Sequence, residues 1–229
     1  MVGGLLYATN AVGLVEAFNP ATGSTVWTQK STEANEGNPG LGGALRGVAH
    51  WGEGANARIF SYYKTNLYAL NAKTGEPVAS IGTGGRIDPA VKGSFLWNAA
   101  PVVVRDVIVV GSSMPEQDSA AKKEGEVGEV RAFDVRTGRL RWRFRPIPSE
   151  DDPGAKSWED LSVLRFIGAG NVWAPFSADD ELGYVYLPTS SPTNDMYGGH
   201  RPGANLYTSS IVCIDAMTGR RVWHYQTIH

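Results

Sequence analysis

The chain has 229 residues with a formal net charge of −2, and 42% of its residues are hydrophobic against 19% charged. This balance excludes a strongly basic nucleic-acid-binding surface and leaves enough apolar surface for a core. The single cysteine, Cys213, excludes an internal disulfide framework and a multi-cysteine metal site, and no apolar run is long enough to span a membrane. The 28 glycines and 7 tryptophans, with few helix-favouring runs, favour an all-β chain with many tight turns.

One short motif occurs four times along the chain. It reads Ala or Cys, any residue, Asp or Asn, two residues, Thr-Gly, and usually a Trp four residues after the Gly. The motifs begin at Ala17, Ala69, Ala132 and Cys213, so their first residues are 52, 63 and 81 positions apart. A period of about 50 residues with insertions of variable length is typical of radial repeats, in which insertions fall in loops.

The residue types of this motif predict a hairpin between two strands. Asp or Asn opens a turn by hydrogen-bonding nearby backbone, and Gly adopts a conformation that is costly for other residues. The small first residue leaves room for a large ring, so we expect the Trp of one unit to pack on the small residue of the next. Each ring would then bury about 150–250 Å². In the second unit Ala79 stands at the Trp position, so a weaker contact is expected there.

Apolar or alternating runs precede the motifs and predict the remaining strands, at residues 5–7, 59–62, 101–111 and 183–188. The third unit is the clearest, because two apolar runs flank a predicted turn at Arg105 and Asp106. Matching the first unit to it places residues 1–4 at the equivalent turn. The strand before that turn would then be missing, leaving an unpaired edge. We therefore expect the N-terminus to be a truncation.

These elements predict one all-β domain over residues 1–229, a partial β-propeller truncated at both ends. It would hold about four blades, each a four-stranded antiparallel sheet with a tryptophan-docking hairpin. The blades would lie at about 1–30, 44–80, 95–145 and 170–229. On the repeats alone, a propeller without chemistry is as good an interpretation as an enzyme, because a fold does not imply a function.

The segments between the motifs narrow this choice. Residues 46–51 read Arg-Gly-Val-Ala-His-Trp, and residues 172–175 read Val-Trp-Ala-Pro. Together with residues 98–101, 109–113, 185–188, 197–203 and 223–229, they resemble the eight-bladed dehydrogenases that depend on pyrroloquinoline quinone (PQQ). The resemblance covers nearly the whole chain and is closest to the branch of membrane glucose dehydrogenase and its soluble relatives. Related hairpins also occur in non-enzymatic propellers of outer-membrane assembly factors.

The resemblance implies a set of cofactor-binding residues. Trp173 would form the floor under the flat quinone, whereas a bland interpretation makes it a core tryptophan in a strand. Arg46 would pair with a cofactor carboxylate, or else form a surface salt bridge. His50 would lie near the quinone or at a neighbouring core position. Asn98 and Ser113 would hydrogen-bond the cofactor, although a serine pair after a buried strand is often only a strand end.

A calcium ion is also implied by the resemblance, with oxygen ligands as this ion requires. Glu126 would be one ligand, with Glu124 as the alternative, although this lysine- and glutamate-rich stretch also fits a solvated loop. Ser191 stands where the family has an Asn, and a serine hydroxyl is a weaker ligand than an amide carbonyl. Asn194 or Asp195 would compensate.

The resemblance further implies oxidation of a small alcohol or sugar hydroxyl, with transfer of two electrons to PQQ and then to a quinone or cytochrome. The protein would be periplasmic. The catalytic aspartate would lie about five residues beyond His229, so the chain alone is expected to be inactive. The alternative is a cofactor-free propeller that acts as an interaction or outer-membrane assembly scaffold. The residues that follow His229 in the gene would discriminate the two.

Overall fold

The computed structural model describes residues 1–30, 46–63, 66–88, 99–113 and 122–228, which form four antiparallel sheets in chain order. The first sheet contains β1 (Leu6–Thr9), β2 (Val15–Phe18) and β3 (Thr25–Thr28). The second contains β4 (Ala49–Trp51), β5 (Arg58–Tyr63), β6 (Asn66–Asn71) and β7 (Arg86–Ile87). The third contains β8 (Val102–Val104), β9 (Val107–Val110), β10 (Val130–Asp134) and β11 (Leu140–Phe144). The fourth contains β12 (Ser177–Asp179), β13 (Tyr184–Pro188), β14 (Ser210–Asp215) and β15 (Arg221–Gln226).

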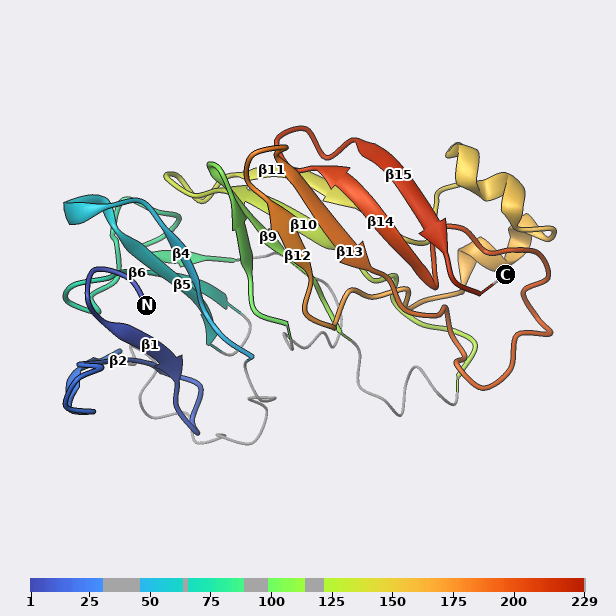
Figure 1. The fold of residues 1–229 in the computed structure, drawn as a ribbon. Coiled ribbons are helices and arrows are strands. Elements are labelled where there is room, and N and C mark those ends of the chain that lie inside the picture. The colour runs from blue at the N-terminus through green and yellow to red at the C-terminus, as the bar shows by residue number, and fades with distance from the viewer. Residues whose placement is uncertain (31–45, 64–65, 89–98, 114–121, 229) are drawn as a thin grey trace.

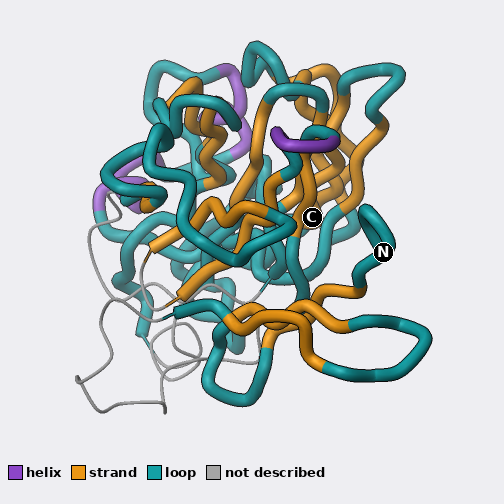
Figure 2. Tube along the Cα trace, turned by 90° about the vertical axis from the view of Figure 1, so that its left-hand side faces the viewer, coloured by secondary structure: helices purple, strands orange, loops and turns teal. Residues whose placement is uncertain are grey.

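Strands dominate the trace, and the described helical turns are short (Figure 1 and Figure 2). They are the 3-10 turns η2 (Gly54–Asn56), η3 (Pro153–Ser157) and η4 (Leu161–Arg165). No helix among the described residues has the length and apolar character needed to cross a membrane. Four antiparallel sheets that follow one another along the chain confirm the predicted all-β partial propeller of about four blades.

The first sheet begins at the turn that the repeat alignment predicts. Val2 and Leu5 form an isolated antiparallel bridge, with hydrogen bonds of 2.9 and 3.0 Å between their backbones. Gly3 and Gly4 connect them with φ angles of +55° and +81°, which glycine adopts without steric cost. Val2 thus takes the place of the strand that β8 forms in the third sheet.

The sheets pack face to face, so the middle strands of the second and third sheets are covered on both sides. On β5, Phe60 packs in one core cluster with Ile108 of the third sheet. The adjacent Ile59 points the other way and packs with Val15 of the first sheet. The side chains of Ile59, Phe60 and Ile108 are all fully buried. On β9, Ile108 likewise packs in the cluster shared with the second sheet and Val109 in the cluster shared with the fourth, which explains why residues 107–110 form a continuous apolar run instead of an alternating one.

Tryptophans tie neighbouring sheets together, as the motif predicts. The Trp27 indole donates to the carbonyl of Ala72 in the second sheet at 3.1 Å. The Trp142 indole donates to the carbonyl of Ala216 in the fourth sheet at 2.7 Å. The contact surface differs from the expected one, because each ring packs on the turn glycine of the next unit. A Cβ added at Gly75 would lie 2.5 Å from the Trp27 ring.

The small first residue of the motif pairs with the tryptophan of its own hairpin and not, as expected, with that of the preceding unit. Ala17 lies directly opposite Trp27 in the same hairpin, and Ala132 lies opposite Trp142. Both alanines are fully buried. They leave the indole of their own hairpin free to lean across to the neighbouring sheet, where the turn glycine receives it.

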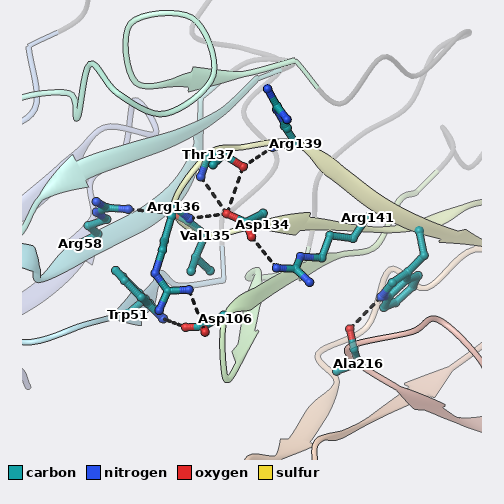
Figure 3. A network of polar contacts seen from close by, with 11 residues as sticks. Trp51, Arg58, Asp106, Asp134, Val135, Arg136, Thr137, Arg139, Arg141 and Ala216 are labelled. Atoms are coloured by element: carbon teal, nitrogen blue, oxygen red, sulfur yellow. Dashed lines mark hydrogen bonds and ion pairs between the residues drawn. The ribbon is translucent and has the colours of Figure 1, made fainter.

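The second unit is joined to the third without the hairpin tryptophan of the motif, because Ala79 stands at its position. Pro77 makes only an isolated bridge to Leu70, because proline has no N–H to continue the ladder, and the outer strand resumes as β7, beyond residue 80. In place of an indole, the Arg58 guanidinium donates to the Val135 carbonyl at 2.9 Å (Figure 3).

A polar cluster surrounds this contact (Figure 3). The guanidinium carbons of Arg58 and Arg136 lie 5.0 and 4.8 Å from the centroid of the Trp51 ring. Asp106 accepts from the Trp51 indole at 3.1 Å and pairs with Arg136 at 2.7 Å. Trp51, although adjacent to a predicted site residue, therefore contributes to the junction between the second and third sheets.

Candidate functional site

The candidate site lies beside the N-terminal ends of β4, β8 and β12, which are the first strands of the second, third and fourth sheets. The strand β8 contacts both β4 and β12, so the first strands of the second, third and fourth sheets are neighbours. In a propeller these strands surround the central axis. Residues that precede them can therefore meet across blades that are not adjacent.

Arg46 and Trp173 meet in this way. Arg46 precedes β4 and Trp173 precedes β12, and the guanidinium carbon lies 5.6 Å from the centroid of the Trp173 ring. This is within the range of a cation–π interaction, which contributes about 0.5–1 kcal/mol at an exposed site. The structure thus brings together two residues for which the sequence predicts cofactor binding.

Exposure distinguishes the two interpretations of Trp173. Its neighbours Val172 and Phe176 are 1% and 9% exposed, whereas Trp173 is 43% exposed and stands outside any strand. A core tryptophan in a strand is therefore excluded. The indole offers an apolar face to solvent or to a flat ligand, next to a guanidinium that can bind an anionic group.

His50 lies on β4, four residues after Arg46. Its Nε2 is buried and accepts or donates no hydrogen bond within the described part of the chain. Burial lowers the pKa of the imidazole below its usual range, and a hydrogen bond with the Gly52 backbone acts in the opposite direction. A neutral histidine with an unsatisfied buried nitrogen can donate or accept a hydrogen bond with a ligand.

Asn98 and Ser113 are the other two predicted cofactor contacts. Asn98 lies outside the described residues. Ser113 follows β9 and is 6% exposed. Its neighbour Ser112 is 3% exposed and makes contacts that the sequence does not predict.

Ser112 joins the third sheet to the segment that carries Trp173. Its hydroxyl lies 3.1 Å from the Glu129 carbonyl and 3.3 Å from Oδ1 of Asn171. Asn171 is 3% exposed and stands two residues before Trp173. No sequence signal distinguishes this asparagine from those that open turns, because its partner comes from a different repeat.

The two main predicted calcium ligands flank one segment. The Ala169 amide donates to the Glu126 carbonyl at 2.9 Å, and the Gly170 amide donates to the Ser191 carbonyl at 3.0 Å. Ala169 also forms isolated bridges with Val127 and with Pro192, the residues that follow Glu126 and Ser191, so the two predicted ligands flank it on its two sides. The Ser191 hydroxyl is 3.3 Å from that of Ser209.

The two alternative ligands already have other contacts. The Glu124 carboxylate lies 3.7 Å from the Lys123 ammonium. Oδ1 of Asn194 accepts from the Tyr197 amide at 2.8 Å. Among the described residues, no three His, Cys, Asp or Glu side chains converge to hold a metal ion. These residues therefore do not by themselves form an acid-rich calcium cage.

Comparison with known proteins gives consistent relatives. The chain is 30% identical to the quinohemoprotein alcohol dehydrogenase ADH-IIG of Pseudomonas putida, over 99% of this chain and 32% of the relative. It is 28% identical to the glycerol dehydrogenase large subunit of Gluconobacter oxydans, over 100% of this chain and 32% of that protein. The crystal structure of quinohemoprotein alcohol dehydrogenase from Comamonas testosteroni superposes with a TM-score of 0.79 at 26% identity, covering 100% of this chain and 34% of that one.

The chain spans about a third of the length of the curated relatives that it matches. These relatives are alcohol and glycerol dehydrogenases, and the narrower resemblance to the glucose dehydrogenase branch stays a prediction. All residues from 1 to 229 match the PQQ family described as "Glucose/ethanol/alcohol dehydrogenase, beta-propeller domain". The chain therefore belongs to the family of PQQ-dependent glucose, ethanol and alcohol dehydrogenases and represents part of its β-propeller domain.

Proposed function

We propose that the protein oxidises an alcohol or sugar hydroxyl and that this chain supplies part of its PQQ site. The observation that supports the proposal most is the contact between Arg46 and Trp173, 5.6 Å from guanidinium to ring centroid. They come from the second and fourth sheets and meet where a ligand on the axis would touch both. The pair offers an apolar face and a cation side by side, as a flat anionic ligand requires.

The residues present fit the cofactor. PQQ is a flat quinone with three carboxylates, and Trp173 presents an indole face that is 43% exposed. Arg46 is exposed beside it and can bind a carboxylate through two parallel N–H donors. Nε2 of His50 is a buried polar atom with no hydrogen-bond partner among the described residues, and a ligand atom could satisfy it. Bound PQQ supplies a two-electron acceptor, which no amino-acid side chain provides.

Each residue has a distinct part in this proposal. Trp173 supports the ring system and excludes water from one of its faces. Arg46 fixes its orientation through a carboxylate. His50, held neutral by burial, hydrogen-bonds a polar atom of the bound group. Asn98 and Ser113 add further hydrogen bonds to it.

Calcium belongs to the proposal, with no reaction step assigned to it. Glu126 is the preferred carboxylate, because it is exposed and forms no ion pair within the described residues, whereas Glu124 lies beside Lys123. Ser191 is the second proposed ligand, and Asn194 its alternative. Two ligands are fewer than the six to eight oxygens that Ca²⁺ takes, so further ligands are needed to complete the coordination.

A small alcohol or sugar is the proposed substrate, a quinone or a cytochrome the proposed electron acceptor, and the periplasm the proposed location. The relatives that carry the name alcohol dehydrogenase support an alcohol. A cofactor-free scaffold is the alternative outcome of the experiment that follows.

The test is PQQ binding and dye-linked alcohol oxidation by the full-length protein. We expect added PQQ to quench the tryptophan fluorescence of the protein until its binding site is saturated. Arg46→Lys, which keeps the charge and loses the planar fork, is expected to weaken PQQ binding about tenfold. Trp173→Ala is expected to weaken it at least as much and to remove most of the quenching.

Arg139→Lys provides the matched control. Arg139 is exposed in a turn and forms no ion pair in the described part of the chain, so this variant should bind PQQ like the wild type. A wild-type protein that neither binds PQQ nor oxidises alcohols would favour the scaffold. Equal PQQ affinity in the wild type and in Arg46→Lys would remove Arg46 from the site.

A further inference from the structure

The segment that carries Trp173 is held by backbone hydrogen bonds on both sides. On one side the Gly128 amide donates to the Ala169 carbonyl at 2.7 Å. On the other side the Ser190 amide donates to the Asn171 carbonyl at 2.9 Å. The segment therefore lies between the third and fourth sheets, attached to both.

Two glycines of the third sheet allow an unusually close approach. A Cβ added at Gly128 would lie 2.2 Å from Oδ1 of Asn171, and one added at Gly111 would lie 2.0 Å from the Val172 carbonyl oxygen. Both distances are far below van der Waals contact. Asn171 and Val172 thus occupy the space that side chains at Gly111 and Gly128 would fill, and this packing leaves them little freedom to shift.

The Asn171 side chain adds a polar contact to this packing. It is 3% exposed, and its Oδ1 accepts from the Ser112 hydroxyl at 3.3 Å. The same hydroxyl is 3.1 Å from the Glu129 carbonyl and accepts from the Glu129 amide at 3.3 Å. Because a serine has one hydroxyl proton, that proton is shared between the two acceptors, and the Asn171 side chain is oriented by the end of β9.

Trp173 leaves this packed region abruptly. Val172 is 1% exposed, and Trp173, the next residue, is 43% exposed. Since nearly half of the indole is exposed, we take its direction to follow chiefly from the backbone at residues 171 and 172. A platform for a flat ligand must be held in one orientation, since misplaced groups lose binding energy to reorganisation.

We propose that Asn171, through its hydrogen bond with Ser112, is a positioning residue that sets the orientation of Trp173 for cofactor binding. The assignment rests on the proposed function, because it gives Trp173 the role of cofactor platform. It goes beyond that function by placing a determinant of the site at the junction of the third and fourth sheets. Asn171 acts through Trp173 and needs no contact with the cofactor.

The experiment uses the full-length protein and four variants: Asn171→Leu, Asn171→Asp, Ser112→Ala and Trp173→Ala. Leucine keeps the shape of asparagine and removes the acceptor, so PQQ affinity should fall about tenfold. Aspartate keeps an acceptor for the Ser112 hydroxyl and should recover affinity to within about threefold of the wild type. Ser112→Ala should resemble Asn171→Leu.

A double-mutant cycle separates positioning from a general structural effect. When Trp173 is already alanine, Asn171→Leu should have no further effect on PQQ affinity, because nothing remains to be positioned. Ser210→Ala is the matched control: the hydroxyl of this buried serine of β14 donates to the Thr208 carbonyl at 2.8 Å and, in the described part of the chain, bonds neither Asn171 nor Ser112. It should lower stability and leave PQQ affinity unchanged.

A readout without cofactor keeps this inference distinct from the proposed function. The emission of Trp173, obtained by subtracting the spectrum of Trp173→Phe, should shift in Asn171→Leu even when no PQQ is present. If the wild type binds no PQQ, the proposed function fails while this shift still tests the positioning. Equal losses of affinity with and without Trp173, or an unchanged Trp173 emission in Asn171→Leu, would overturn the positioning role.

Discussion

Arg58 donates from its guanidinium to the carbonyl of Val135 at 2.9 Å, across the junction of the second and third sheets. The equivalent carbonyl in two other units accepts from an indole, Trp27 to Ala72 at 3.1 Å and Trp142 to Ala216 at 2.7 Å. The unit with Ala79 in place of Trp has thus replaced an indole donor by a guanidinium donor. The junction keeps its hydrogen bond, and the Trp51 ring that stacks on Arg58 supplies the aromatic surface.

Replacing Arg58 is therefore expected to destabilise the protein. Arg58→Met keeps an apolar stem and loses both the hydrogen bond and the cation–π contact, which together contribute about 2–3 kcal/mol to the free energy of unfolding. Urea denaturation of the full-length protein measures this change. Arg139→Met is the control, and its effect should stay within about 0.5 kcal/mol. Equal effects of the two variants would contradict the replacement.

Three turn glycines allow the energy of packing an indole on the turn to be separated from the cost of backbone strain. Gly23, Gly75 and Gly219 have φ angles of +71°, +73° and +76°, so alanine costs similar backbone strain at each, about 1 kcal/mol. An added Cβ meets nothing within 4 Å at Gly23, but it would lie 2.5 Å from the Trp27 ring at Gly75 and 2.6 Å from Trp142 at Gly219.

Gly75→Ala and Gly219→Ala should therefore lower the free energy of unfolding by about 2–4 kcal/mol, against about 1 kcal/mol for Gly23→Ala. The difference measures how tightly the indoles are docked. Urea midpoints of the three variants check it, and a similar cost at all three positions would show that strain alone accounts for these glycines.

Asp134 should make stability depend on pH. Burial by itself raises the pKa of this carboxyl, but the Arg141 guanidinium and the Thr137 donors outweigh burial and lower the pKa to about 2. The unfolded chain has a pKa of about 3.9. The stabilisation is therefore present above pH 4 or so, and it is lost as the pH falls toward the folded value of about 2.

Asp134→Asn isolates the charge, because Asn19 and Asn71 accept the same turn hydrogen bonds in the first two units. At pH 7 the variant should be less stable than the wild type by about 1–2 kcal/mol. That difference should shrink from pH 4 to pH 2, as measured by urea denaturation over this pH series. A constant difference would mean that the Arg141 pair adds nothing.

The calcium proposal predicts different effects on Ca²⁺ affinity for substitutions at Glu126 and at Glu124. Glu126→Gln should weaken Ca²⁺ binding by the full-length protein at least about tenfold, because it removes the proposed anionic ligand. Glu124→Gln should leave the affinity unchanged, since that carboxylate lies 3.7 Å from Lys123. Calorimetric titration with Ca²⁺ of the protein freed of metal measures both. The reverse pattern would assign the ligand to Glu124.

Much of the fold was predictable because the hairpins are specified by local chemistry. Asp134 opens its turn by accepting from the amides two and three residues later, and Gly138 completes the turn with φ of +72°. These requirements act within a few residues and repeat with the motif. The tryptophan partner was less predictable, because the turn glycine and the small strand residue both leave room for a ring.

For the candidate site, the sequence alone determined residue types. Its resemblance to the PQQ dehydrogenases implied a cofactor role for Arg46 and Trp173, and its repeated motif determined that four hairpin units would follow one another. Only the tertiary structure decided that Arg46 reaches Trp173, that Asn171 meets Ser112, and that Arg58 replaces an indole. These pairs come from different units, so their contact depends on how the sheets are arranged around the axis. No spacing along the chain encodes that arrangement, because it results from the packing of whole sheet faces.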